Sequence, residues 1–133
     1  MVLEHIGIAV RDIDASLSHF EVLFGTAPYK TEEVVSEGVR THFFDAGGTK
    51  IELLESLHDD SPVAKFLEKR GPGLHHLAFR SDDVATDFER LKKAGYRVLG
   101  DGPTKGADGK HIFFVHPGDT QGVLTEFCMD APK

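Results

Sequence analysis

The sequence predicts an α+β fold built from two tandem βαβββ modules. Three observations support this prediction. The first strand and helix recur 71 residues later, the apolar residues of both helices follow the helical period, and three strand-like runs follow each helix. We therefore expect a single domain over residues 1–133, with modules at 1–58 and 73–130 and a linker helix within 59–72.

Both modules begin with an apolar strand that carries a histidine at the same place. Segment 3–10 aligns with segment 74–81, so that His5 corresponds to His76. The helix that follows begins at acidic residues, which can cap free backbone N–H groups, and it ends near a glycine. The apolar positions of the first helix recur in the second as the pairs Ile13 and Val84, Leu17 and Phe88, and Phe20 and Leu91.

Three strand-like runs follow each helix. In the first module they cover about residues 28–36, 38–46 and 50–57, and in the second about 96–100, 110–117 and 122–129. A Gly-rich loop separates the runs 96–100 and 110–117. In the linker, Ser61 can cap a short helix whose first position suits Pro62. Neither module alone buries both faces of its sheet, so the modules must pack together or pair between chains.

The composition excludes several classes of function. A formal net charge of −7 argues against sequence-independent binding to nucleic acid or to an anionic membrane. No apolar run approaches the roughly 20 residues that a membrane-spanning helix needs. The single cysteine, Cys128, cannot form an internal disulfide, and we expect a cytoplasmic location.

Four polar side chains interrupt strands that are otherwise apolar. His5 and His76 lie in the first strands of the two modules, and Glu52 and Glu126 lie in the last strands. A carboxylate is costly to bury in an apolar strand unless it is paired or binds a metal. The symmetry of the repeat would bring all four side chains to one cleft. Two imidazoles and two carboxylates suit one divalent ion such as Co, Ni, Zn or Mn, and an octahedral ion keeps two positions for substrate oxygens.

Other interpretations of these residues are simpler. Strand alternation could point Glu52 and Glu126 to solvent, and a lone histidine in a strand is more often structural than a metal ligand. The repeat-matched set of four favours metal binding. Of the other histidines, we expect His75 to be structural, because it points away from the face of its neighbour, whereas His42 could line the cleft or face outward.

These segments resemble the vicinal oxygen chelate (glyoxalase/bleomycin resistance) superfamily, and within it the methylmalonyl-CoA epimerases. The four polar residues alone fit the superfamily, because bacterial glyoxalases share them. The linker helix and the strand that ends at His116-Pro117 favour the epimerases. The resemblance is sharpest in HIGIAV at 5–10, TKIELLE at 49–55, DSPVAKFLEK at 60–69, GLHH at 73–76 and GVLTE at 122–126.

The resemblance implies a metal-dependent enzyme of propionate metabolism that interconverts (R)- and (S)-methylmalonyl-CoA through a metal-stabilised enolate. It implies a homodimer and cobalt as the most active ion, with His5, Glu52, His76 and Glu126 as ligands. Inversion at carbon needs a base on each face. Some members carry a glutamate on the third strand as one base, but the corresponding residue here is Thr41, which cannot take up a proton. Our hypothesis therefore assigns the two bases to Glu52 and Glu126.

Two further functions compete with this one. The first is a glyoxalase I-like isomerase that acts on a thiol hemithioacetal, and the second is a metal-free protein of the same fold that binds or sequesters a small molecule. The intact set of four polar residues argues against the metal-free protein. The sequence does not separate methylmalonyl from ethylmalonyl substrates, and it offers only Lys50, Lys105 and Lys110 as candidates for contacts with the phosphates of coenzyme A.

Overall fold

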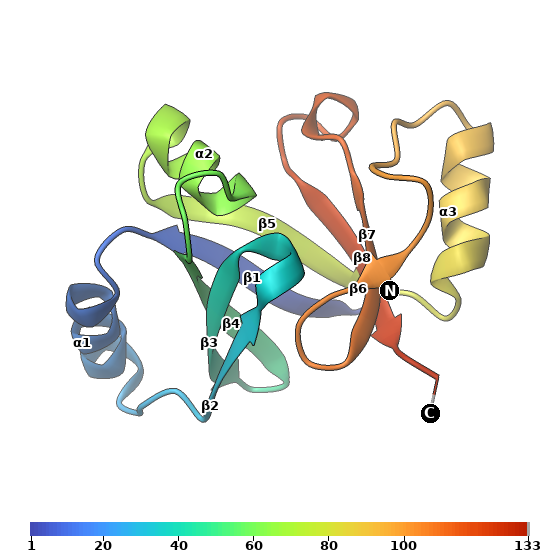
Figure 1. The fold of residues 1–133 in the computed structure, drawn as a ribbon. Coiled ribbons are helices and arrows are strands. Elements are labelled where there is room, and N and C mark those ends of the chain that lie inside the picture. Colours follow the sequence, from blue (N-terminus) through green and yellow to red (C-terminus); the bar gives the residue numbers. More distant parts are fainter. Residues whose placement is uncertain (133) are drawn as a thin grey trace. The chain divides into compact units, whose positions relative to one another are not determined.

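The computed structural model describes residues 1–132, and its elements follow the predicted order of two βαβββ modules joined by a helix (Figure 1). This order confirms the predicted α+β fold class. Residue 133, the end of the predicted domain, lies outside the described residues. The elements are β1 (Leu3–Val10), α1 (Ile13–Phe24), β2 (Lys30–Val34), η1 (Val35–Glu37), β3 (Val39–Ala46), β4 (Thr49–Ser56), α2 (Pro62–Arg70), β5 (Gly73–Arg80), α3 (Val84–Lys93), β6 (Thr104–Lys105), β7 (Lys110–Val115), η2 (Pro117–Asp119) and β8 (Thr125–Asp130).

The chain forms two compact units, and β1 contributes to both. One unit contains residues 6–75, and the other contains residues 1–5 together with the chain from His76 onward. In the 6–75 unit the strands are ordered β2-β3-β4-β1, and in the other unit they are ordered β5-β8-β7-β6. None of the described helices is long and apolar enough to cross a membrane.

In the 6–75 unit, helices α1 and α2 cover opposite faces of the strands. The apolar side of α1 packs against Phe44 and Leu53, as its periodicity predicted. Helix α2 packs against Val39 and Leu54, which point the other way because successive strand residues alternate between faces. Helix α1 begins at the Asp12 cap, as expected from the acidic residues of its first turn.

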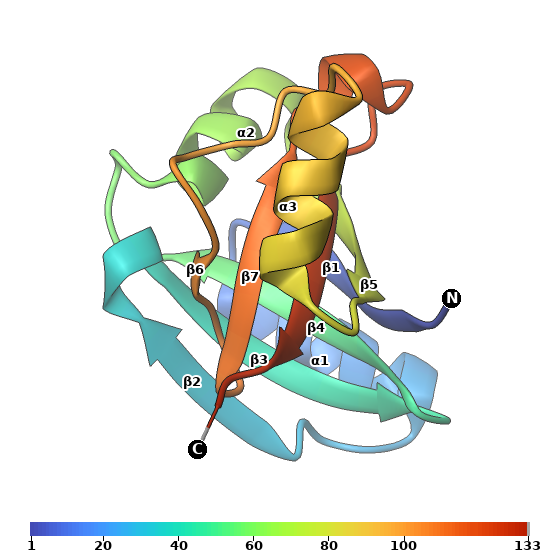
Figure 2. The same cartoon turned by 90° about the vertical axis from the view of Figure 1, so that its right-hand side faces the viewer.

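In the other unit, α3 covers one face of β7 and β8 and lies across β7 in Figure 2. Its residues Val84 and Phe88 are buried against Phe113 and Val115. Strand β5 pairs with β8 in parallel, whereas β7 runs antiparallel to both β8 and β6. The face turned away from α3 holds a smaller buried cluster of Ala78, Ile112, Cys128 and Phe114. Three of the four polar residues that the sequence singled out, His5, His76 and Glu126, meet on this second face.

The predicted strand at 96–100 is wrong. Within it, Val98 makes an isolated bridge to Val115, and the two-residue strand β6 lies instead in the expected Gly-rich loop. Gly95 and Gly100 bound the segment with φ angles of 92° and 79°, so the extended backbone stops after a few residues. Strand β6 pairs with Ile112 and His111 in the first half of β7.

The irregular segment 96–100 is held by a charged contact in addition to its backbone hydrogen bonds with residues 114 and 116. The backbone N–H and the guanidinium of Arg97 both donate to the Asp119 carboxylate, at 2.8 Å for the backbone nitrogen and 3.1 Å for Nε. These hydrogen bonds hold the pKa of Asp119 below its ordinary value.

We predict that Asp119→Asn removes a contribution to stability that depends on pH. Because the pKa of Asp119 is lower in the folded chain than in the unfolded one, its contribution is present above about pH 4 and is lost as the pH falls through the folded value. The melting temperature of the variant should lie below that of the wild type at pH 7, and the two should converge near pH 2–3. A difference that stays constant down to pH 2 would contradict the charged contact.

A second prediction concerns the start of α2. Ser61 is buried, its Oγ accepts a hydrogen bond from the Ala64 backbone N–H at 3.0 Å, and it lies 2.6 Å from the Ser56 hydroxyl. We expect Ser61→Ala to lower the free energy of unfolding by about 1–2 kcal/mol, measured by urea denaturation, because it removes the helix cap. Ser56→Ala keeps the cap and should cost less, and an equal loss in both variants would show that the hydroxyl pair matters more than the cap.

Candidate metal centre

Three of the four predicted ligands lie together. His5 comes from β1, His76 from β5 and Glu126 from β8, and their side chains converge on the face turned away from α3. The Nε2 atoms of His5 and His76 lie 3.1 Å apart, and the Glu126 carboxylate oxygens lie 3.5 Å from the first and 3.4 Å from the second. All three residues are buried, with exposed fractions of 5%, 5% and 4%.

Strand pairing explains why His76 and Glu126 meet. The parallel register of β5 and β8 places Ala78 opposite Glu126. His76 lies two residues before Ala78, so it points to the same face of the sheet as the carboxylate. The repeat located these residues in the sequence, and the parallel pairing of β5 with β8 brings two of them to one place.

The three ligand atoms have the spacing that one divalent ion requires. With metal–ligand bonds of about 2.1 Å, adjacent ligand atoms are separated by about 3.0 Å in octahedral and about 3.4 Å in tetrahedral geometry. The 3.1 Å between the two Nε2 atoms and the 3.4 Å from Nε2 of His76 to Oε1 of Glu126 fall in this range, and the 3.5 Å from Nε2 of His5 to Oε2 of Glu126 lies just above it. Two imidazoles and a carboxylate suit borderline ions such as Zn, Co, Ni or Mn. The residues present therefore fit a divalent metal ion.

The walls around the trio are apolar. Phe114 lies opposite Glu126 in the β7–β8 register, and its ring stands at 90° to that of His76 with centroids 5.8 Å apart. Ala78, Ile112 and Cys128 are buried on the same side. Apolar surroundings exclude water and strengthen electrostatic interactions at the site.

The fourth predicted ligand, Glu52, belongs to the 6–75 unit. It lies in the middle of β4, is buried, and stands opposite Phe43 in the β3–β4 register. Its face also carries Leu54 and Thr41. The interpretation that Glu52 points to solvent is therefore wrong, whereas its role as a ligand stays a prediction.

Thr41 and His42 have structural surroundings. Thr41 is 1% exposed and opposes Leu54, so the third strand offers no acid or base at this place. His42 points to the opposite face, where its Nε2 lies 3.2 Å from a Glu55 carboxylate oxygen and its Nδ1 lies 3.2 Å from the Thr31 hydroxyl. This contact answers the open question about His42, which faces away from Glu52.

His75 is structural, as the sequence predicted. Its ring packs edge-on against Phe66, with centroids 4.9 Å apart. Burial lowers the pKa of His75 to about 4, because the apolar surroundings disfavour the charged imidazolium. The residue is therefore a neutral packing element at physiological pH.

Sequence comparison identifies the family. The model of the Glyoxalase/Bleomycin resistance protein/Dioxygenase superfamily matches residues 4–114. The chain belongs to this superfamily. Its βαβββ order and the ligand spacing at His5, His76 and Glu126 agree with the resemblance found in the sequence.

Relatives within the superfamily are named as epimerases. The chain is 40% identical to an ethylmalonyl-CoA/methylmalonyl-CoA epimerase of Cereibacter sphaeroides, over 93% of this chain and 94% of the relative. It is similar to the solved methylmalonyl-CoA epimerase of Mycobacterium tuberculosis, with 35% identity, a TM-score of 0.90, and coverage of 98% of this chain and 88% of that one. A methylmalonyl-CoA epimerase solved in complex with methylmalonyl-CoA and NH4+ is 39% identical, with a TM-score of 0.89 and coverage of 97% and 94%.

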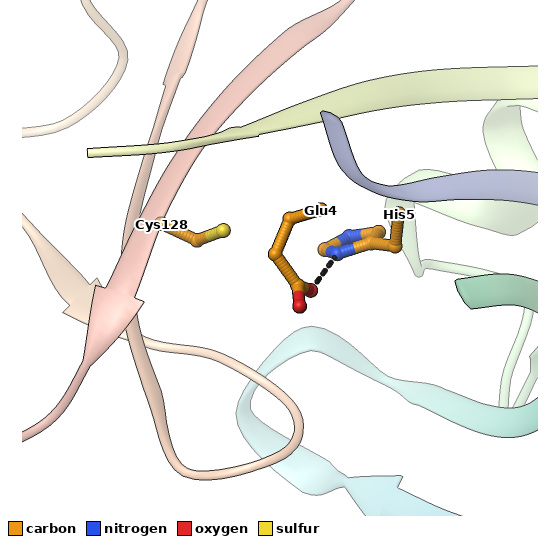
Figure 3. A group of neighbouring side chains, drawn as sticks. All are labelled: Glu4, His5 and Cys128. Atoms are coloured by element: carbon orange, nitrogen blue, oxygen red, sulfur yellow. Dashed lines mark hydrogen bonds and ion pairs between the residues drawn. The ribbon is translucent and has the colours of Figure 1, made fainter. Parts of the chain in front are cut away.

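Reasoning from the sequence missed one residue of this superfamily member's site. The Glu4 carboxylate is buried and accepts a hydrogen bond from Nδ1 of His5 at 2.8 Å (Figure 3). The sequence analysis treated 3–10 simply as an apolar strand. A signal was present, because a charged residue directly precedes a predicted ligand histidine inside that strand.

Proposed function

We propose that this chain is a metal-dependent epimerase that interconverts (R)- and (S)-methylmalonyl-CoA. The observation that carries the proposal is the likeness, over more than nine-tenths of the chain, to relatives named as epimerases of this acyl-CoA. The buried cluster of His5, His76 and Glu126 supports it, because these residues can hold the divalent ion that the proposal requires. A homodimer and a cytoplasmic location remain predictions from the sequence.

His5, His76 and Glu126 would hold the ion, with Glu52 as the fourth ligand. When bound, the ion would act as a Lewis acid toward the oxygens of the thioester and the carboxylate of the substrate. We propose cobalt as the most active ion. The apolar wall formed by Phe114 and Ile112 would keep water away from the reacting carbon.

The chain's own carboxylates would move the proton. The hydrogen to be exchanged lies on the carbon between a thioester and a carboxylate, and inversion requires that it leaves from one face and returns on the other. We propose Glu52 and Glu126 as the two bases, because Thr41 offers no group that can take up a proton. Each carboxylate would accept the α-proton of one enantiomer and donate a proton to form the other.

The test is solvent deuterium exchange into each enantiomer of methylmalonyl-CoA, followed by NMR. We expect exchange at the α-carbon with the purified protein, its loss after treatment with a chelator, and its return when Co²⁺ is added. Parallel loading with Zn²⁺, Ni²⁺ and Mn²⁺ ranks the ions. Absence of exchange with every ion, together with turnover of the hemithioacetal of methylglyoxal, would overturn the epimerase in favour of the glyoxalase-like alternative.

A further inference from the structure

We infer that Glu4 is a positioning residue that fixes the tautomer and the orientation of the His5 ring for metal binding. This inference rests on the metal-dependent function proposed above. Glu4 and His5 are consecutive residues of β1, and both are buried, with exposed fractions of 4% and 5%. Figure 3 shows the Glu4 carboxylate directed at the His5 ring, with the 2.8 Å hydrogen bond to Nδ1 between them.

The hydrogen bond determines which nitrogen of His5 carries the proton. An ionised carboxylate can only accept a hydrogen bond, so Nδ1 of His5 must be the donor. A neutral imidazole with its proton on Nδ1 has its lone pair on Nε2. Nε2 is the atom that lies 3.1 Å from Nε2 of His76 and 3.5 Å from the Glu126 carboxylate. Glu4 therefore presents the His5 lone pair to the centre of the trio.

The carboxylate also makes His5 a stronger ligand. A hydrogen bond from the distal N–H of a ligating imidazole to a carboxylate orients the ring and raises its basicity, and loss of such a partner costs about 10–100-fold in metal affinity. Glu4 lines a cavity of about 270 Å³ together with two cationic residues, Arg80 and Lys110, of which Lys110 pairs with Asp130.

The repeat makes the assignment specific to one of the two histidines. The residue that corresponds to Glu4 in the second module is His75, which is neutral at physiological pH and packs on Phe66. The first module therefore has a carboxylate next to its predicted ligand histidine, whereas the second module has an imidazole at the corresponding place. A change at Glu4 should act directly on His5, and it should reach His76 only through the 3.1 Å contact between the two Nε2 atoms.

Cys128 offers a competing interpretation. Its Sγ, the Glu4 carboxylate and a nitrogen of His5 lie within 4.8 Å of one another, which is close enough for a shared ion. We favour the positioning role because Nδ1 of His5 already donates to Glu4 and the Cys128 thiol donates to the Phe79 carbonyl oxygen at 3.6 Å. An ion bound to the thiolate would reveal itself through a sulfur-to-cobalt charge-transfer absorption.

The experiment compares the wild type with Glu4→Gln, Glu4→Asp and the control Asp130→Asn. Asp130 lines the same cavity, but its carboxylate pairs with Lys110 rather than with His5. Affinity for Co²⁺ is measured by competition with a chelator, and the protonation of each imidazole in the metal-free protein is measured by ¹⁵N NMR. Thermal unfolding of the metal-free variants reports whether they fold.

We expect Glu4→Gln to weaken Co²⁺ binding by about 10–100-fold, Glu4→Asp to recover part of that loss, and Asp130→Asn to bind as the wild type does. The ¹⁵N spectrum of the wild type should show the proton of His5 on Nδ1. Unchanged affinity in a folded Glu4→Gln variant, a proton on Nε2 in the wild type, or a charge-transfer absorption that disappears in Cys128→Ser would each overturn the inference. If the wild type binds Co²⁺ but does not exchange the α-proton, the proposed function fails, and the affinities still decide the role of Glu4.

Discussion

Glu126→Gln will remove both metal binding and epimerisation. The substitution keeps the size of the side chain but replaces an anionic oxygen, 3.4 Å from Nε2 of His76, by a neutral amide. Because we propose that Glu126 binds the ion directly, the loss of affinity should be at least as large as the loss of about 10–100-fold that follows removal of a hydrogen-bond partner of a ligand. Loss of a general base should lower the rate of epimerisation by a further factor of about 10²–10⁴. Exchange of the α-proton should therefore fall to background for both enantiomers.

The matched control for this prediction is Glu55→Gln. Glu55 also lies in a strand, but its carboxylate contacts Arg40 and His42 on the face turned away from Glu52. We expect this variant to bind Co²⁺ and to exchange the α-proton as the wild type does. If Glu126→Gln bound the ion with wild-type affinity by calorimetry, Glu126 would not be a ligand, and the trio would have to be reassigned.

The second prediction separates the two proposed bases. In Glu52→Gln, measured at saturating Co²⁺, epimerisation should fall by about 10²–10⁴-fold, because one face of the substrate loses its base. Exchange of solvent deuterium into one enantiomer should persist, because Glu126 still serves the other face. The measurement is NMR of each enantiomer after incubation in D₂O, with the stereochemistry of the product read separately from the deuterium content.

Thr41→Val is the control for the base assignment. Thr41 is buried on the same face of β3 as Phe43, which stands opposite Glu52 in the register. Its replacement by valine removes the hydroxyl with little change in volume. We expect epimerisation within about twofold of the wild type, because a threonine hydroxyl is a poor base at neutral pH. Full epimerisation in Glu52→Gln would exclude the two-base hypothesis, and a large loss in Thr41→Val would point to a proton path through its hydroxyl.

The repeat explains how much of the site could be predicted from the sequence. His5 and His76 were found because each occupies the same place in an apolar strand, and Glu126 because it interrupts the last strand of its module. Such a pattern constrains which residues share a role. The pattern could not show which face of the sheet His42 points to. Alternation shows only which residues of one strand share a face, and the register of His42 with Leu53 then assigns that face.

Two features escaped the sequence for different physical reasons. Residues 96–100 have the composition of a strand. The glycines at both ends let the backbone leave the extended conformation, and tertiary contacts then determined the conformation of the segment. Glu4 was missed because a charged residue in the second position of a strand is ordinary at a strand end. Its burial and its 2.8 Å contact with His5 distinguish it from a solvated carboxylate.

The parallel pairing of β5 with β8 has a consequence for biosynthesis. His5 in β1 is synthesised well before Glu126, which lies in β8. The trio cannot form until β8 has been synthesised and has paired with β5, a contact between distant parts of the sequence that forms slowly. Metal loading should therefore follow the synthesis and pairing of β8, and an ion in the medium should stabilise the folded state without assisting its earlier stages.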